Sequence, residues 1–525
     1  MPTFLAAFGH LVCGVLHGFD RLVFNGHLRQ LCYTQGMDYF LWTNQVLLKD
    51  FETYAKERTA ELIDGSLTEA RRLARPSLYL ESTKIDKEKE ALRIAKRDKV
   101  KDGLICVLKC VEPGRTYEVR GDHEQKKLVL HGKRGKCANL YHYYMHPQFG
   151  FMYARIQTWF PFAMQVYING REWLGRQLDQ AGLWYERRDN KFIDLEDFAK
   201  AQALMDEQLR TDWPKTLDQI VRTIHPAHPQ VLGRSPLDYY WSVFQSEWAS
   251  DITFRTRDDA HRLVEQWARH AMLNYSSADV MRFLGRTVPS HGRVNARFDG
   301  EVISTRQRRE EGICVKHWVN GNSIKMYDCD RNARIETTIN QPGQLRVLRP
   351  TEGNPDGPQD LRQLRLGVAD LTRRAEVSQA ANERYAAAAA AIQETTPLKE
   401  IVEPLCQRVS APGKKRTRKV RALNPFSADD AALLEAVNDP KHSVNGMRNR
   451  ELVNTLYAKP SATPEERRRR SARVTRLIRL LRAHGILHKV PKTHRYQVSP
   501  KGRKTVTALL AARGANAEFL TSNAA

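Results

Sequence analysis

The chain has 525 residues, which is too long for one hydrophobic core, so we expect about three or four domains. Hydrophobic residues make up 41% of the chain, as in an ordinary folded protein, and no stretch approaches the roughly 20 apolar residues of a membrane span. The eight cysteines are scattered, which excludes a disulfide scaffold and favours a reducing cytoplasm, nucleoid included. The net charge of +24 is concentrated at one end: residues 401–525 hold 26 Lys and Arg against 9 Asp and Glu, which predicts a nucleic-acid partner.

Residues 1–100 form a mixed region that begins with an apolar stretch. The first 15 residues lack a basic start and continue into the strand-like run FDRLVFNG, so we expect a buried element, with a signal peptide as the alternative. Asp20 lies in this apolar strand and is followed by Arg21. An acidic residue at the end of such a strand is typical of the first metal ligand in many metal-dependent nucleases. The same pattern also occurs where the acid forms a salt bridge with an arginine at a strand end.

Residues 101–175 predict an antiparallel β-rich core, because short strand-like runs are separated by glycine, proline and charged turns. Alternation in residues 151–159 places Met152, Ala154 and Ile156 on a core face. The opposite face carries Phe151, Tyr153, Arg155 and Trp159. Such a face can stack the bases of a single strand, and it becomes ordinary core if a helix covers it.

The spacing of cysteines in this core does not predict zinc. Cys106 and Cys110 share one face of a strand, but four residues separate them by about 13 Å. That distance is too long for two ligands of one tetrahedral ion, so we expect buried thiols and no metal at this place.

Residues 176–300 have mainly helical spacing, and residues 301–350 predict a β-hairpin patch that can join the earlier sheet. In the run SIKMYDCDRNARIETTIN, a turn at about residues 329–332 places Lys325 opposite Glu336. The simplest interpretation of this pair is a cross-strand salt bridge.

A second interpretation of the hairpin is catalytic. A lysine, an aspartate and a glutamate on adjacent strands can hold a divalent metal for phosphodiester cleavage. The candidate catalytic residues are therefore Asp20, Asp328 at the strand end and Glu336, with Mg²⁺ or Mn²⁺ as the cofactor of such a nuclease. No P-loop, dinucleotide fingerprint, hydrolase elbow or kinase signature occurs in the chain.

The phrase YDCDRNARIE is loosely similar to the "YDK…LRIE" stretch of phage and plasmid rolling-circle replication initiators of the gene II family. The resemblance covers fewer than 20 residues, Cys329 stands where the family has lysine, and the paired-histidine motif is not recognisable. It implies metal-dependent strand cleavage with a catalytic tyrosine, for which Tyr385 is a helical candidate.

Residues 359–400 predict a helix, and residues 401–425 a basic linker. The linker carries a cluster that is either a flexible arm for phosphate contacts or a nuclear-localisation signal. Its members are Lys414, Lys415, Arg416, Arg418, Lys419 and Arg421.

Residues 426–515 predict three helices, a β-hairpin and a closing helix. Ser427 is the expected N-cap of the first helix, and the third helix begins at Pro464 and ends at Gly485. At 100° per residue, the third helix turns an apolar face inward and arginines to the opposite side. The apolar residues are Val474, Leu477, Ile478 and Leu481, and the arginines are Arg469, Arg473, Arg476 and Arg479. The arginine row is either a nucleic-acid recognition surface or a solvated charged face.

This order of elements resembles the MarR-like winged-helix family over residues 426–513. The resemblance implies that the arginine helix enters the major groove of a duplex and that the hairpin tip contacts the backbone. The tip residues that would do so are Lys492, His494 and Arg495.

Together these patterns predict an α+β multidomain protein that binds nucleic acid, duplex DNA first and RNA or single strands as alternatives. We expect its C-terminal winged helix to dock on duplex and its body to recognise further nucleic acid or a partner, as in replication, mobile elements or ribonucleoproteins. The alternatives are a metal-dependent nuclease or strand-transfer enzyme, and a transcription regulator whose body senses a ligand. No membrane partner is expected, and the pattern gives no oligomeric state.

Overall fold

The structure is a computed structural model of the whole chain. It describes all residues except 83, 225–236, 287–301, 310–311, 352, 355, 391–397, 411–418, 440–441, 443–445, 492 and 515–525. No helix in the described part of the chain is long and apolar enough to cross a membrane.

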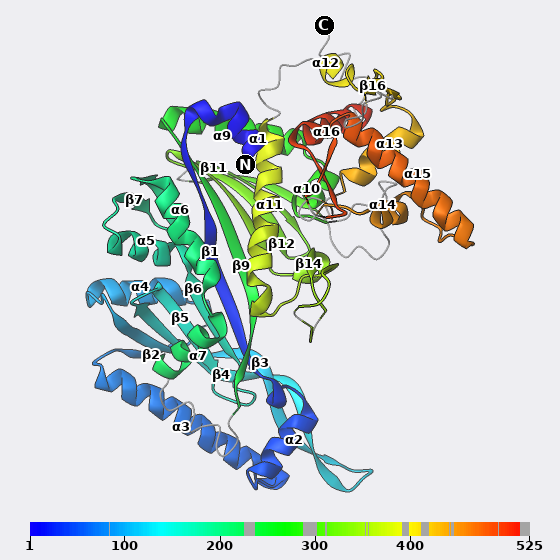
Figure 1. The fold of residues 1–525 in the computed structure, drawn as a ribbon. Helices are drawn as coiled ribbons and strands as arrows, with labels where there is room; N and C mark the ends of the chain where they lie inside the picture. The colour runs from blue at the N-terminus through cyan, green and yellow to red at the C-terminus, as the bar shows by residue number, and fades with distance from the viewer. Residues whose placement is uncertain are drawn as a thin grey trace.

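One large mixed sheet organises the body, in the strand order β10-β11-β12-β13-β9-β1-β6-β5-β4-β3-β2 (Figure 1). Neighbouring strands are antiparallel, except that β2 pairs with β3 in parallel. The strands are β1 (Val12–Leu28), β2 (Ser77–Tyr79), β3 (Gly103–Asp122), β4 (Lys127–His146), β5 (Gly150–Gln157), β6 (Met164–Asn169), β9 (Tyr239–Phe254), β10 (Ile303–Arg309), β11 (Gly312–Val319), β12 (Asn322–Cys329) and β13 (Asn332–Ile339). Long β1 and β9 join the two β-rich segments of the sequence, so the fold is α+β.

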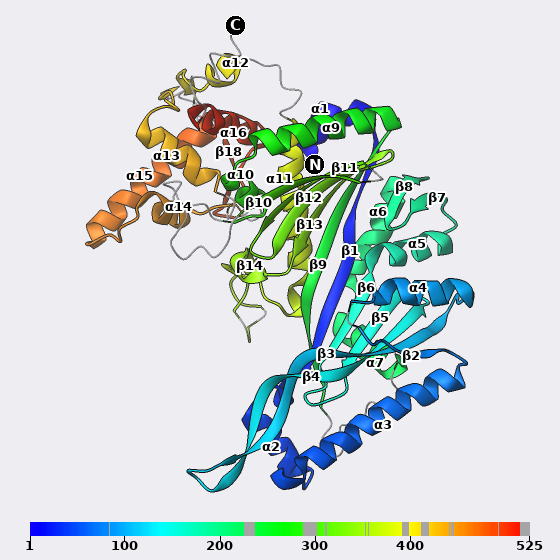
Figure 2. The same cartoon turned by 180° about the vertical axis from the view of Figure 1, so that it is seen from behind.

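Helices cover both faces of this sheet (Figures 1 and 2). One face packs against α1 (Pro2–Phe8), α3 (Phe51–Arg72), α7 (Trp213–Ile224), α9 (Arg257–Asn274), α10 (Ser277–Phe283) and α11 (Leu371–Ala389). The other face packs against α4 (Lys87–Arg97), α5 (Gly170–Gln180), α6 (Phe198–Glu207) and the small hairpin β7–β8 (Tyr185–Arg188, Lys191–Leu195). Helix α2 (Thr34–Thr43) follows β1 through a short 3-10 turn, Arg29–Cys32. Apolar side chains on both faces are therefore buried, and polar side chains between β1 and β12 are held inside the body.

Strands β3 and β4 are each 20 residues long and project from the sheet as a two-stranded ribbon (Figure 2). The sequence predicts two short strands in place of each, with breaks at Pro113 and at Gly132. Strand β2 pairs with β3 only at Val107–Lys109, so at Pro113 the edge of β3 that faces away from β4 has no partner strand. A proline, which lacks an N–H donor, is tolerated at such an edge, and the strand continues through it.

The predictions for the middle of the chain miss strands in two places. In the described part of residues 176–300 helices predominate, as predicted, but β9 also lies among them and occupies the centre of the sheet. Residues 359–400 do not form one helix: the stretch opens with β15 (Asp360–Gln363), which pairs with β14 (Arg346–Arg349), before α11 and the short α12 (Leu398–Val402). Tertiary pairing selects strand at these positions over the local helical preference.

The C-terminal module has a hydrophobic core of its own and the predicted order of elements. These are α13 (Ala428–Val437), α14 (Asn449–Leu456), α15 (Pro464–Ala483), β18 (Leu487–Lys489), β19 (Tyr496–Val498) and α16 (Pro500–Gly514), preceded by the bridge pair β16–β17 (Val409–Ser410, Lys419–Val420). Ser427 caps α13 by accepting from the Asp430 N–H, as expected. The apolar stripe of α15 is buried at Val474, Ile478 and Leu481, which confirms the predicted orientation of that helix.

Candidate metal centre

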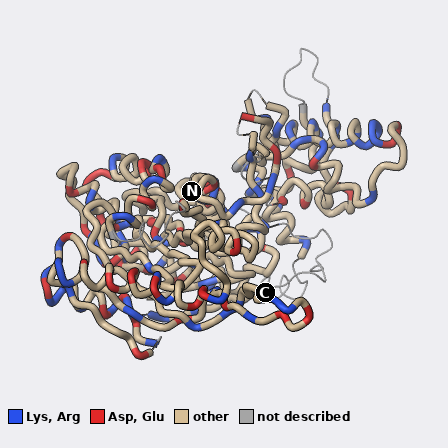
Figure 3. The backbone as a smooth tube through the Cα atoms, turned by 90° about the horizontal axis from the view of Figure 1, so that it is seen from below, with Lys and Arg blue, Asp and Glu red and all other residues tan. Residues whose placement is uncertain are grey.

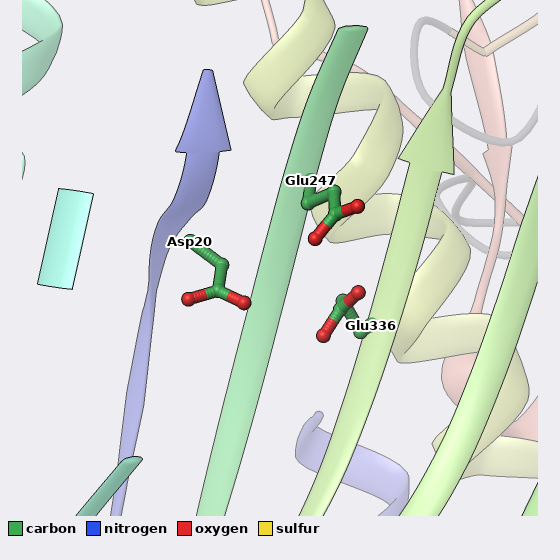
Figure 4. A group of neighbouring side chains, drawn as sticks. All are labelled: Asp20, Glu247 and Glu336. Atoms are coloured by element: carbon green, nitrogen blue, oxygen red, sulfur yellow. The ribbon is translucent and has the colours of Figure 1, made fainter. Parts of the chain in front are cut away.

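Three carboxylates from three adjacent strands converge on one face of the sheet (Figure 4). Asp20 comes from β1, Glu247 from β9 and Glu336 from β13, and one oxygen of each lies within 4.8 Å of the others. Asp20 and Glu336 are buried and Glu247 is nearly so. Carboxylate oxygens at this spacing can bind a single divalent cation, because metal–oxygen bonds of about 2.0–2.6 Å bring ligand atoms to such distances.

The strand registers explain how the three side chains meet. Glu336 pairs with Ala249 on β9, so Glu247 lies diagonally across the ladder from it. Between β1 and β9 the register shifts at Asp20: Phe19 pairs with Trp248 and Arg21 with Glu247, which leaves Asp20 as an extra, bulged residue. A bulge redirects the side chain that it carries. The bulge turns Asp20 toward the two glutamates.

A buried network of charges surrounds Asp20. The Arg334 guanidinium lies 3.3 Å from the Asp20 carboxylate and makes two hydrogen bonds to Asp251, and Arg171 approaches Asp251 at 3.2 Å. The Asn190 side chain also donates to Asp20. Because opposite charges alternate through this network, the buried carboxylates are compensated and held in a fixed orientation.

The three carboxyl groups differ in acidity. Burial, together with repulsion from Glu336 and Asp20, raises the pKa of Glu247 to about 7. Burial also raises the pKa of Asp20, against the attraction of Arg334. Burial acts in the same sense on Glu336, but Lys325 and Arg334 outweigh it and hold the pKa of that carboxyl below its ordinary value. A cation placed among them would relieve the repulsion between like charges.

Lys325 and Tyr327 of β12 border the carboxylates. The predicted pairing of Lys325 with Glu336 is confirmed in the strand register, and the two side chains form an ion pair of 2.7 Å. The Tyr327 hydroxyl donates to Glu336 at 3.3 Å. A lysine, a tyrosine and three carboxylates therefore share one small region of the sheet.

Asp328 and Tyr385, both named from the sequence, lie elsewhere. Asp328 follows Tyr327 directly, so it points to the opposite face of β12, where it contacts His261 of α9 at 2.8 Å. Tyr385 is fully buried among the helices of that opposite face. Neither residue can share an ion or a reaction with Asp20 and Glu336.

Glu247 was not predicted, although β9 carries a signal. In the run YYWSVFQSEWASDITF the acids Glu247 and Asp251 are four residues apart, which places both on one face of a strand. The helical interpretation of residues 176–300 hid this pattern.

The predicted base-stacking face of β5 is not an open surface. Phe151 is buried and Tyr153 nearly so, because α4 covers this face and forms a small core with Phe151 and Tyr143. Trp159 packs edge-on against Phe51, and Arg155 approaches Glu112. The face predicted to be core, Met152, Ala154 and Ile156, is indeed buried.

The arginine row of α15 is solvent-exposed and lies on the part of the molecule that protrudes beside the body (Figure 3). Arg473 pairs with the exposed Asp429 of α13 at 3.1 Å. Within the described part of the chain, Arg469, Arg476 and Arg479 form no ion pair with an acid. Three of the four charges are therefore available to a polyanion.

The remaining predicted contacts at this end divide into four groups. Arg495 is buried and donates to the Gly446 carbonyl, so it holds the hairpin to the module and is not a free tip residue. Arg421 makes a two-pronged ion pair with Asp430 and is not part of a flexible arm. Lys419 and His494 are exposed. Outside the described residues lie Lys414, Lys415, Arg416, Arg418 and Lys492.

Comparisons of the chain with known protein families, with curated proteins and with solved structures found no significant match.

Proposed function

We propose that the protein is a metal-dependent phosphodiesterase acting on nucleic acid. The observation that carries this proposal is the convergence of Asp20, Glu247 and Glu336 on one face of the sheet, with ligand oxygens within 4.8 Å of one another. Oxygen ligands of this kind suit Mg²⁺ or Mn²⁺. The strongly basic chain supplies the means to bind the polyanionic substrate.

Each residue of the site has a role in this chemistry. The three carboxylates hold the cation, which when bound polarises a phosphoryl oxygen and stabilises the charge that develops during cleavage. Lys325, partly exposed beside Glu336, places a positive charge next to the incoming phosphate. Arg21 lies 3.8 Å from Glu247 and is the more exposed of the two, so it marks the solvent side of the site.

The C-terminal module is the second element of the proposal. The order of its helices and hairpin, and the exposed arginines of α15, support a winged helix that docks on duplex. Docking by this module would bring the body, with its carboxylate site, to a nearby strand.

The test is cleavage of labelled single-stranded DNA, duplex DNA and RNA with Mg²⁺, with Mn²⁺ and with EDTA. We expect metal-dependent cleavage that Glu336→Gln and Glu247→Gln each reduce by at least 100-fold while binding in EDTA is retained. Asp328→Asn is the matched control, because this buried acid lies on the opposite face and should keep full activity. Cleavage that persists in both glutamine variants would refute the proposed site.

A second candidate function is strand transfer through a covalent intermediate. It is favoured by the Tyr327 hydroxyl, which lies within hydrogen-bonding distance of Glu336. In this reaction the phenolic oxygen, losing its proton, attacks phosphorus and forms a Tyr–O–P bond. The P–O bond to the neighbouring sugar breaks, and the sugar oxygen leaves with a proton.

Substrate labelled on either side of the cleaved bond separates the two candidates. Strand transfer predicts a protein–nucleic acid adduct that survives denaturing electrophoresis and is lost in Tyr327→Phe. Hydrolysis by water predicts no adduct and substantial cleavage by Tyr327→Phe.

A further inference from the structure

Helix α2 presents aromatic rings to solvent at the end of the body where the ribbon projects (Figure 1). Tyr39 and Trp42 are 58% and 74% exposed, and their ring centroids lie 5.9 Å apart. The helix itself is anchored, because Met37, Phe40 and Leu41 on its inner side are buried. Two neighbouring rings held outward on an anchored helix are typical of a binding surface.

The ribbon brings positive charge to the same place. Arg115 of β3 and Arg134 of β4 are directly opposite each other and exposed, and neither forms an ion pair with an acid that the structure describes. Like charges in this arrangement destabilise a ribbon unless an anion lies between them. Both arginines line a hollow together with Gly114, Gly132 and Lys133.

The arginines lie on the side of the ribbon that contacts the start of α2. Tyr117 is two residues from Arg115 and so points to the same face of β3, and its hydroxyl donates to the Leu31 carbonyl just before the helix. Burial raises the pKa of the Cys32 thiol, and the charge of Arg115 acts on it in the opposite direction. The aromatic rings and the arginine pair thus belong to one end of the molecule.

Exposed aromatic residues continue from this end toward the carboxylates along β9. Tyr240 and Phe244 are 39% and 50% exposed, and they lie seven and three residues before Glu247. Arg29, between β1 and α2, stacks on Tyr240 with its guanidinium carbon 3.5 Å from the ring centroid. At about 3.3 Å per residue, the seven residues from Tyr240 to Glu247 span about 23 Å, the length of several nucleotides.

We infer that these residues form a track for single-stranded nucleic acid, with bases stacked on Trp42 and Tyr39 and phosphates held by Arg115 and Arg134. The inference rests on the proposed function and specifies a single strand as its substrate. Binding should not depend on the sequence of that strand, because every base has a face that can stack. Asp38 of α2 is exposed beside Tyr39, and its negative charge repels phosphates. The phosphates of the strand should therefore bind the ribbon and not the helix.

The test is binding of fluorescein-labelled (dT)20 and of a 20-base-pair duplex to the full-length protein, measured by anisotropy in EDTA. Stacking on each ring predicts that Tyr39→Ala with Trp42→Ala weakens (dT)20 binding at least tenfold, while Tyr39→Phe with Trp42→Phe loses much less. Arg115→Ala with Arg134→Ala should lower the slope of log K against log salt by about 1.4, since each phosphate contact of a single strand contributes about 0.7. Trp184→Ala removes a similarly exposed tryptophan beside α5 and should change neither quantity.

Unchanged (dT)20 affinity in the Tyr39→Ala, Trp42→Ala protein overturns the track. So does a result in which that variant loses binding only to phosphatidylserine–phosphatidylcholine vesicles, because the rings then serve a membrane surface. All binding is measured without metal, so an absence of cleavage in Mg²⁺ or Mn²⁺ would remove the proposed function and leave the binding result standing.

Discussion

At the level of single residues, the body depends on charges that are buried only because they are paired. Arg334 is 1% exposed and forms ion pairs with Asp20 on one side and with Asp251 on the other. A buried pair of this kind contributes little net stability when it is compared with apolar residues of similar shape. Removing one partner is a different matter, because it leaves an uncompensated charge in a medium of low dielectric constant.

We therefore predict that Arg334→Met lowers the free energy of unfolding by about 3–5 kcal/mol. Urea denaturation followed by circular dichroism measures this change. Arg262→Met is the control: Arg262 forms an exposed pair with Asp259 at 3.6 Å, and such pairs contribute less than about 1 kcal/mol. Equal losses in the two variants would show that the network around Asp20 is not the source of the effect.

The raised pKa of Glu247 predicts how stability and metal binding change with pH. Below its ordinary pKa of 4.5, Glu247 is protonated in the folded and the unfolded chain, so its contribution to stability is full and does not change with pH. Between pH 4.5 and about 7 the folded state holds the extra proton, so the contribution of Glu247 to stability falls as the pH rises. A cation must displace this same proton, so its affinity should rise about tenfold per pH unit up to pH 7.

Calorimetric titration of Mn²⁺ between pH 5.5 and 8 in buffers of different ionisation enthalpy measures both the affinity and the proton released. In Glu247→Gln the binding should be weaker and its steep pH dependence below pH 7 should disappear. A wild-type affinity that does not vary over this range would contradict the assignment of Glu247 as a ligand.

At the level of elements, the sequence predicts those whose boundaries are marked by local chemistry. Ser427, Pro464 and Gly485 mark the ends of helices in the C-terminal module, and α13 and α15 begin and end near them. The hairpin of β12 and β13 was predicted for the same reason, since its turn is short and its strands alternate. Strand β9 was not predicted, because its partners β1 and β13 lie more than 75 residues away in the sequence and no short turn connects it to either.

The exposed face of α15 predicts a specific effect of salt. If Arg476 and Arg479 contact phosphates of a duplex, replacing both with alanine should lower the slope of log K against log salt by about 1.8, or about 0.9 for each contact. Arg495→Ala should act differently. Because Arg495 is buried and holds the hairpin, its loss should reduce the stability of the module and change the salt slope less. Filter binding to a 30-base-pair duplex from 50 to 300 mM salt measures the slopes, with Arg72→Ala of α3 as the control.

At the scale of the whole molecule, the carboxylate site exists only when the sheet is complete. Its three acids are separated by 227 and 89 positions in the chain, and they meet because β1, β9 and β13 are neighbours. Asp20 and Glu336 could be named from the sequence because each lies in a strand with its own pattern. Which acids share a face could not, since that depends on the order of strands and on the bulge at Asp20.

A cation at this site would link three distant segments, so we predict that it stabilises the entire body. Because it binds the folded chain alone, Mn²⁺ at 100 times its dissociation constant should add about 2.7 kcal/mol to the free energy of unfolding. Thermal melting with and without Mn²⁺ measures the shift. Glu336→Gln should lose most of it, whereas Asp328→Asn should keep it, because Asp328 points to the other face of the sheet. Equal shifts in both variants would mean that the ion binds elsewhere. An ion held by Asp20, Glu247 and Glu336 loses a ligand in Glu336→Gln, but it loses none in Asp328→Asn, because Asp328 lies on the opposite face.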